Sequence, residues 1–336
     1  MKKNLFPPLL AALLLRLPLP DAVAQDALLS QPFQTPLQIN PAWAGFHDGT
    51  YQLNGMYRSQ WQTLTDPFKT IAAHLNTSLP AGKNKNHIVG LALSGNADKA
   101  GAVQFTTSAF ALTGAFHYNF GHAFQHYMGA AVSFGAGNTA LDLASVTTDE
   151  TFTTGGTSEA IGFEKTNFSD LSFGLAYHLL SDTSHLHVGF ALFHANSPDL
   201  AFTSDGRSSI RPKAVLAASY SYLLRPQLEF TPVAIVTFQG PSRQLLAGGQ
   251  LRYSFASLLE ANYALAGALY LRYGNALIPA IGIRMGDLDV GLSYDLMMGP
   301  LAGQDSRQGA MELTLSYKGK LKGISSGRIY NPRFGN

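Results

Sequence analysis

Apolar and polar side chains alternate along the last third of the chain, from residue 244 to residue 318. In residues 287–296 every second position is apolar, and the positions between them are Asp, Gly or Ser. Residues 311–318 repeat the pattern with Met, Leu, Leu and Tyr on the apolar face. A period of two with one apolar and one polar face is typical of a β-strand rather than a helix. The region is therefore predicted to be a series of short strands.

The alternation extends, less regularly, over most of the chain and divides it into about fourteen segments of strand length. An even number of strands is what a single-chain bacterial outer-membrane barrel requires. The segment at 276–285 is the least regular, because Pro279 interrupts it. The predicted strands are 50–60, 68–79, 86–95, 103–117, 122–136, 167–180, 185–195, 211–224, 227–239, 244–256, 263–273, 276–285, 287–298 and 309–319.

Alternation alone does not decide which face is buried. A soluble sandwich turns its apolar face inward, whereas a membrane barrel turns it toward lipid and its polar face toward the lumen. The connections favour the barrel, because short and long ones alternate along most of the chain, as in an up-and-down barrel with short periplasmic turns and long external loops. The longest connection, 137–166, is rich in Thr, Ser and Gly. It is either a flexible surface loop or a lid or partner-docking loop.

The N-terminus carries an export signal. Lys2 and Lys3 precede a mostly apolar stretch, and residues 22–24 form an A-x-A cleavage site. The alternative, a membrane anchor, is disfavoured because the apolar stretch is shorter than the roughly 20 residues that a spanning helix needs. The predicted organisation is a signal peptide at 1–24, a periplasmic N-terminal segment at 25–48, a barrel at 49–319 and a basic periplasmic tail at 320–336.

Composition narrows the class further. Removal of residues 1–24 takes away three of the 23 basic and one of the 21 acidic residues, which leaves 20 of each and a net charge of zero. Nucleic acid is therefore not an expected partner. No cysteine is present, which excludes disulfides and zinc-thiolate sites, and no apolar run of 18 residues follows the signal. The expected fold is all-β, a transmembrane antiparallel up-and-down β-barrel of about 14 strands in the outer membrane, in contact with its lipids.

Charged residues on the polar faces of the last strands should meet inside such a barrel. They are Arg252, Arg272, Arg284, Asp289, Asp295 and Glu312. One interpretation is that they pair across adjacent strands and stiffen the wall. The other is that they line a conduit, or grip a plug or cargo. Several inward positions, such as Gly248 and Ala266, are small, which leaves space in the lumen unless something fills it.

Motifs for catalysis are not evident. The chain has no G-x-S-x-G elbow, no P-loop and no H-E-x-x-H sequence. His185 and His187 share one strand face, but two ligands without a third are a weak metal site. A hydrolase with a Ser/His pair from distant strands stays an alternative. The prediction is a protein that is not an enzyme and has no cofactor.

Several short motifs resemble the PorP/SprF family, outer-membrane proteins of the Bacteroidetes type IX secretion and gliding machinery. The resemblance covers about 25–334. Its most specific parts are the N-P-A-x-A-G motif, the Y-R-x-Q-W motif and a Tyr-Asp pair. The motif positions are Asn40, Pro41, Ala42, Ala44, Gly45, Tyr57, Arg58, Trp61 and Tyr294. The family often has a Cys before its terminal Pro-Arg-Phe, where this chain has Asn331.

The resemblance implies a non-enzymatic barrel that assists export or surface attachment of cargo proteins and contacts periplasmic components of the machinery. The tail offers Arg328, Tyr330, Arg333 and Phe334 as a docking site for an acidic partner surface, unless it is merely a solvated tail. Two other functions stay open. One is a channel for a small or hydrophobic solute, like a fatty-acid transporter or a porin. The other is a soluble exported sandwich.

Overall fold

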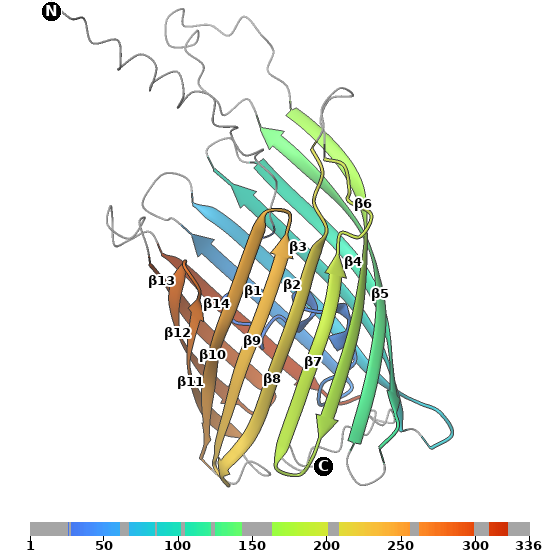
Figure 1. Cartoon of the computed structure of the whole chain (residues 1–336), viewed down its shortest axis with the longest axis vertical. Coiled ribbons are helices and arrows are strands. Elements are labelled where there is room, and N and C mark those ends of the chain that lie inside the picture. The colour runs from blue at the N-terminus through green and yellow to red at the C-terminus, as the bar shows by residue number, and fades with distance from the viewer. Residues whose placement is uncertain are drawn as a thin grey trace, which may run out of the picture.

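The computed structural model describes residues 26, 28–60, 67–84, 86–101, 105–121, 125–142, 163–200, 208–255, 262–298 and 309–321. These residues form a closed antiparallel barrel in which each strand pairs with its neighbours in sequence and β1 pairs with β14 (Figure 1). The predicted fold class is confirmed, and the sandwich is excluded. The strands are β1 (Tyr51–Gln60), β2 (Phe68–Ala81), β3 (His87–Ala100), β4 (Phe105–Asn119), β5 (Gln125–Asp142), β6 (Phe163–Leu180), β7 (Ser184–Phe193), β8 (Lys213–Arg225), β9 (Leu228–Gln239), β10 (Ser242–Ser254), β11 (Tyr263–Arg272), β12 (Ala276–Met285), β13 (Leu288–Met297) and β14 (Ala310–Gly319).

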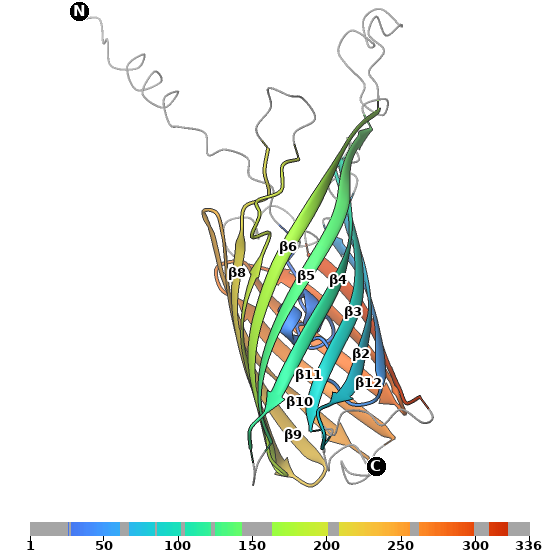
Figure 2. The same ribbon diagram turned by 90° about the vertical axis from the view of Figure 1, so that its right-hand side faces the viewer.

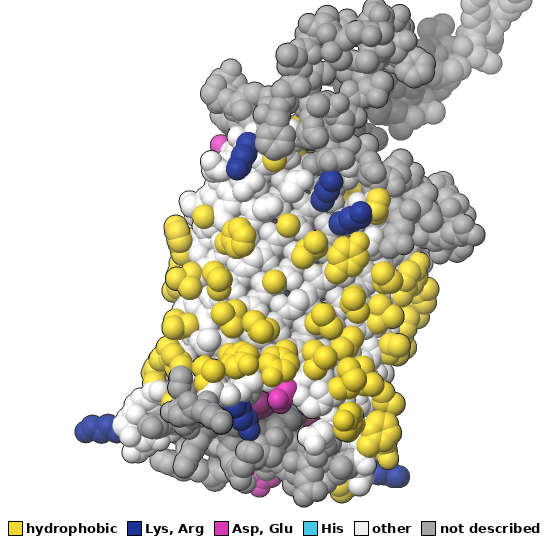
Figure 3. Space-filling view, turned by 180° about the vertical axis from the view of Figure 1, so that it is seen from behind, with side chains coloured by type: hydrophobic (Ala, Val, Ile, Leu, Met, Phe, Trp, Pro, Cys, Tyr) yellow, Lys and Arg dark blue, Asp and Glu magenta, His cyan; other side chains and the backbone are white. Residues whose placement is uncertain are grey.

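The alternation in sequence becomes an inside–outside division of the wall. In β14, Met311, Leu313 and Leu315 are exposed on the outer face, while Glu312 and Thr314 are buried inside. Figure 3 shows hydrophobic side chains over the middle of the outer wall, with Lys and Arg near its two ends. An apolar outer band and a polar interior are the arrangement that a barrel in a lipid bilayer requires.

The wall is not equally tall all round. Strands β5 and β6 have 18 residues each, whereas β11 to β14 have 10. Figure 2 shows the upper parts of β5 and β6 rising above the neighbouring strands. The predicted loop 137–166 is therefore too long at both ends, because residues 137–142 belong to β5 and residues 163–166 to β6, which pair with each other. The alternation is weak there in sequence, since residues 137–140 are Gly, Asn, Thr and Ala.

The N-terminal segment lies inside the barrel, which corrects the prediction that residues 25–48 stand free in the periplasm. Its described part carries two 3-10 helices, η1 (Pro36–Gln38) and η2 (Pro41–Trp43), which Figures 1 and 2 show within the ring of strands. We call residues 28–50 the plug. The plug carries only one charged side chain, Asp48, and its apolar residues pack on the small inward side chains of the wall, so the lumen is a better environment for it than water.

The plug crosses the lumen from one rim to the other. Asp26 contacts Lys213 and Gln239, at the rim that carries the connections 143–162, 194–212 and 298–309. Thr50 contacts Gly319, at the rim of the short turns. We call these the long-loop rim and the short-turn rim. Because long loops face outward in outer-membrane barrels, residue 26 should lie at the external side and β14 should end at the periplasmic side.

This orientation predicts opposite labelling of two tagged variants. An epitope inserted between Gln25 and Asp26 should bind antibody on intact cells, whereas the same epitope after Leu321 should bind only after the outer membrane is opened. Immunofluorescence on intact and permeabilised cells measures both. Labelling of the second tag, but not the first, on intact cells would show that the barrel is inverted.

Among the described residues, none forms a helix that is long and apolar enough to cross a membrane. The predicted signal peptide at 1–24 and the tail beyond Leu321 lie outside the described residues, so the cleavage site and the tail remain predictions.

Candidate functional site: the plugged lumen and its outer vestibule

The N-P-A-x-A-G motif fastens the plug to the wall. The Asn40 side chain accepts a hydrogen bond from the Ala42 amide at 2.8 Å and so caps η2. Its amide group donates to the carbonyl oxygens of Leu175 on β6 and Phe190 on β7, at 2.9 and 3.3 Å. One asparagine therefore ties the plug to two neighbouring strands. Pro41 begins the helical turn, where its missing N–H costs nothing.

The end of the motif needs a residue without a side chain. Gly45 has a φ of +76°, and its backbone touches the backbone of Gly90 on β3 so closely that a Cβ on either residue would clash. The Gly45 amide donates to Asn76 at 2.7 Å, and the Ala44 carbonyl lies 2.8 Å from Nε2 of His117. The motif is thus the contact surface between plug and wall, which explains why its residues are small or amide-bearing.

A buried charge cluster holds the plug nearer the long-loop rim. Arg58 of β1 lies 2.8 Å from Asp295 of β13 and 3.3 Å from Glu312 of β14, and Arg272 of β11 lies 2.7 Å from Asp295. All four side chains are at most 4% exposed. Two acids therefore face two arginines, so the cluster is electrically balanced within the lumen.

The plug completes the hydrogen bonding of this cluster. The amides of Ser30 and Gln31 each donate to a carboxylate oxygen of Glu312 at 2.9 Å. The Ser30 hydroxyl donates to Asp295 at 2.5 Å and accepts from Arg58 at 2.6 Å. Buried charges are tolerated only when their remaining hydrogen-bonding positions are satisfied, and the plug supplies several of those partners. The cluster therefore joins strands of the wall to one another and bonds to the plug.

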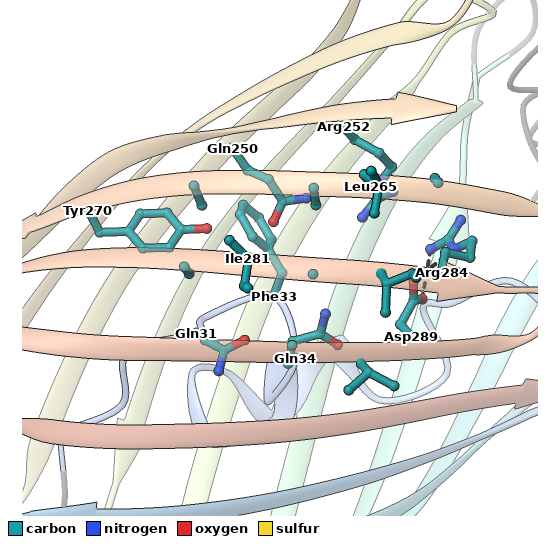
Figure 4. Close-up of a pocket in the computed structure, with 18 residues that line it drawn as sticks. Gln31, Phe33, Gln34, Gln250, Arg252, Leu265, Tyr270, Ile281, Arg284 and Asp289 are labelled. Carbon is teal, nitrogen blue, oxygen red and sulfur yellow. Dashed lines mark hydrogen bonds and ion pairs between the residues drawn. The ribbon is translucent and has the colours of Figure 1, made fainter. Parts of the chain in front are cut away.

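A second group of charges lies nearer the short-turn rim. Arg284 and Asp289, which face each other across β12 and β13, form two hydrogen bonds of 2.8 Å. Arg252 faces Glu229 across β10 and β9, with 3.8 Å between the charged atoms. Figure 4 shows Arg252, Arg284 and Asp289 beside residues Gln31, Phe33 and Gln34 of the plug, around a pocket of about 30 Å³. The small inward residues predicted to leave space are thus faced by the plug.

The structure divides the six predicted lumen charges between these two groups. Arg272, Asp295 and Glu312 belong to the group nearer the long-loop rim, which we call the upper cluster. Arg252, Arg284 and Asp289 belong to the group nearer the short-turn rim, which we call the lower cluster. The sequence interpretation did not assign Arg58 or Glu229 to the lumen and missed the plug altogether. The position of Arg58 in the lumen could have been predicted from closure of the barrel, because closure makes β1 the neighbour of β14 and sets Arg58 opposite Glu312.

The remaining predicted residues lie elsewhere. Tyr57 and Tyr294 sit on the outer face of β1 and β13, with Tyr294 exposed. Trp61 and the tail residues Arg328, Tyr330, Arg333 and Phe334 lie outside the described residues. His185 and His187 line the lumen near the short-turn rim, where Phe46 stacks on His178 at 3.6 Å and His178 bonds His187 at 2.7 Å. No group of three potential metal ligands occurs among the described residues.

An ionic latch fixes the outer end of the plug. Asp26 pairs with Lys213 and lies 3.1 Å from Nε2 of His194, whose Nδ1 lies 3.0 Å from Asp170. Burial works against ionisation of Asp26, but Lys213 and His194 hold the pKa of this carboxyl well below its ordinary value. For His194, burial is outweighed by the bonds to Asp170 and Asp26, which raise its pKa to about 9. The histidine is therefore a cation at neutral pH.

The latch should open as the pH rises. The pKa of His194 is above its ordinary value. The stabilisation that the charged His194 gives to the latch is therefore fully present below about pH 6.5 and is lost as the pH rises through about 9. A nitroxide label at Leu28→Cys, the only cysteine in the protein, should gain a mobile spectral component between pH 7 and 10. In His194→Gln that component should be present at pH 7 already and should not grow. An unchanged spectrum in both proteins would show that the latch does not hold the plug.

Above the plug, the lumen widens into a cavity of about 470 Å³, which we call the vestibule. Its floor is formed by plug residues, including Leu29, Leu37 and Ile39, and its walls come from β1 to β11. His74 of β2 lines it and is 4% exposed, with both ring nitrogens lacking a hydrogen-bond partner among the described residues. Asp170 and Phe168 of β6 mark its upper wall. The vestibule is thus a partly apolar chamber on the external side of the plug.

The chain is similar to known proteins in sequence and in structure. The chain matches a family described as type IX secretion system membrane protein PorP/SprF over residues 22–317. No match was found among curated protein sequences.

Among solved structures, a deltaS2 mutant of the TodX monoaromatic hydrocarbon channel matches with 10% identity, a TM-score of 0.47, and coverage of 84% of this chain and 93% of that one. The CymD monoaromatic hydrocarbon channel matches with the same identity and TM-score, over 84% and 91% of the two chains. A FadL homologue of Pseudomonas aeruginosa has 11% identity, a TM-score of 0.45, and coverage of 83% and 92%. Similarity this distant carries no argument about function.

Proposed function

This chain belongs to the PorP/SprF family of type IX secretion system membrane proteins, and from that premise we propose that it is a closed outer-membrane scaffold that assists the export or surface attachment of cargo proteins. The observation that carries the proposal is the plug. A segment of the chain itself crosses the lumen and is bonded to the wall at the latch, the upper charge cluster and the Asn40 motif. A barrel so filled is better suited to presenting surfaces at its two rims than to passing solutes.

The charges of the lumen support a role without catalysis. Arg58, Arg272 and Arg284 each form ion pairs with carboxylates of the wall, and the plug covers the upper cluster. Groups committed to one another in this way stabilise the barrel and the plug rather than acting on a substrate. The proposed partners are secreted cargo at the long-loop rim and periplasmic components of the machinery at the short-turn rim.

The periplasmic partner is proposed to bind the basic tail. Truncation of residues 320–336 should leave the barrel folded and in the membrane, because the closing strand β14 ends at Gly319. It should reduce both cargo export and recovery of machinery components in pull-downs. If export and pull-down are unchanged, the tail is only a solvated extension.

The vestibule favours a second candidate, a channel for a small apolar solute. Its volume and its apolar floor would suit a ligand of modest size. Transport from there would require the plug to move, because plug residues form the floor. A scaffold should therefore still function when the plug cannot move, whereas a channel should not.

A strain lacking the gene should lose one or a few type IX cargo proteins from its surface or medium, as measured by proteomics, with its outer membrane otherwise intact. Complementation should then be tested with Asn40→Cys/Gly189→Cys, since a Cβ at Gly189 would touch the Asn40 amide and the chain has no other cysteine. A scaffold should restore the cargo with the disulfide formed or reduced. An unchanged secretome with altered solute uptake, restored only by the reduced form, would instead support the channel.

A further inference from the structure

Among the described residues, the upper half of β6 has a partner strand on one side only. On one side β6 pairs with β5 along its whole length, from Phe163 opposite Asp142 to Leu180 opposite Gln125. On the other side it pairs with β7 only from Phe173 opposite Leu192 onward. The ten residues 163–172 therefore extend beyond the last pair with β7, at the long-loop rim.

Within the described part of the chain, contacts to this side of β6 are found at its lower end. The Ala195 amide donates to the Leu171 carbonyl at 2.8 Å, and the Asn196 side chain bonds the Leu171 amide and the Ser169 carbonyl at 2.9 and 2.7 Å. Leu171 and Ser169 thus point their backbone groups away from β5. By the alternation of an antiparallel ladder, Asn167 and Lys165 point theirs the same way. Above Ser169 no strand of the described chain pairs with this side of β6.

Such an edge is unusual in a barrel, because closure normally removes every edge. An unpaired row of N–H and C=O groups is a template for another strand, and β-strand addition is a common way to bind an extended peptide. Figure 2 shows the upper part of β6 standing apart from the segment after β7 and reaching well above it. No strand of the described ranges occupies the position beside this stretch, at the external end of the wall.

The edge also leads into the vestibule. Phe168, Asp170 and Ser172, on successive inward positions of β6, all line that cavity. Leu200 and Ile210, from the segment between β7 and β8, line the same chamber and are buried. A strand added to β6 would therefore turn every second side chain toward the axis of the barrel, and a chain that continues downward would enter a partly apolar chamber.

We propose that residues 163–169 of β6 bind an extended segment of the secreted cargo by β-strand addition, and that the adjoining end of this segment enters the vestibule. The bound segment would have apolar side chains at alternate positions, facing Phe168 and the chamber, and polar ones facing outward beside Lys165 and Asn167. It would lack proline where its amides meet the carbonyls of β6. This inference rests on the proposed function, since it names the surface that holds the cargo.

Two substitutions at one position separate backbone from side-chain recognition. Asn167→Pro removes the amide that points to the free side, and proline is tolerated at strand edges. Asn167→Ala keeps the amide and removes only the side chain. We expect surface-attached cargo to fall about tenfold in Asn167→Pro, since each lost backbone hydrogen bond costs about a factor of ten. In Asn167→Ala it should stay at the wild-type level.

Heat-modified gel mobility of each purified barrel shows whether it has folded. Hydrogen exchange of the unmutated full-length barrel gives an independent answer. The probe is a purified protein that the deletion strain fails to display. Its addition should protect the amides of Lys165, Asn167 and Ser169, while β12 and β13 stay unchanged. Suppose that the deletion strain loses its cargo. The β6 site alone would then be overturned if folded Asn167→Pro displays normal cargo, or if the cargo does not protect the amides of β6. A deletion strain that displays all its cargo would overturn the proposed function as well.

Discussion

Deletion of residues 28–46 should convert a barrel that is silent in planar lipid bilayers into one with a steady conductance. The deletion removes both 3-10 helices and the plug amides that bond to Glu312, but no strand. The inward faces behind the plug carry many small side chains, such as Ala266, Ala268 and Gly291, which do not fill the lumen themselves. Water should then occupy the space and solvate the charges that the plug had covered. Conductance of the purified barrel measures the effect directly.

The disulfide variant Asn40→Cys/Gly189→Cys provides the matched control for that experiment. With the disulfide formed, the plug is retained by a covalent bond, so the barrel should stay silent under voltages that occasionally open the unmodified protein. Reduction should remove this restraint and make openings at least as frequent as in the unmodified protein, because the variant also lacks the Asn40 hydrogen bonds. Silence of the deletion variant in a correctly folded state would mean that the wall itself closes the lumen. Steady conductance of the unmodified barrel would mean that the plug does not seal it.

Arg58→Met should destabilise the barrel by about 3–5 kcal/mol, the usual cost of removing one partner from a buried ion pair. Arg58 lies between Asp295 and Glu312, and all three are at most 4% exposed. Among the described residues, its loss leaves Asp295 paired with Arg272 and Glu312 without a cationic partner. Denaturant unfolding in detergent or lipid vesicles, followed by gel mobility or tryptophan fluorescence, measures the change.

Arg243→Met is the control for the Arg58 variant, because Arg243 is an exposed residue near the long-loop rim and should change the free energy of unfolding by less than about 0.5 kcal/mol. The effect of Arg58→Met should also shrink in the barrel that lacks residues 28–46, since water then reaches the acids. Equal effects in the two backgrounds would show that the plug and the cluster are not coupled. Equal effects of the two single substitutions would show that the cluster contributes nothing.

Much of the wall could be predicted from the sequence, because the period of two is a local property. The strand at 276–285 was placed at both its ends, and β13 and β14 to within one residue. The largest differences are at the upper ends of β3, β5 and β6, which carry few large apolar residues. The length of these strands is fixed by pairing with their neighbours rather than by burial, and pairing between strands leaves little trace in a single sequence.

The sequence by itself determined the class of protein: an exported barrel with an apolar outer face, a lumen lined with balanced charges, and a family identity resting on short motifs. Those features depend on alternation, composition and local motifs, which are written along the chain. Only the tertiary structure decided that residues 28–50 return into the lumen and that Asn40 and Gly45 contact β3, β6 and β7. It also decided that the upper part of β6 has one partner strand among the described residues. Those features join residues that are distant along the chain, and closure of the barrel alone brings them together.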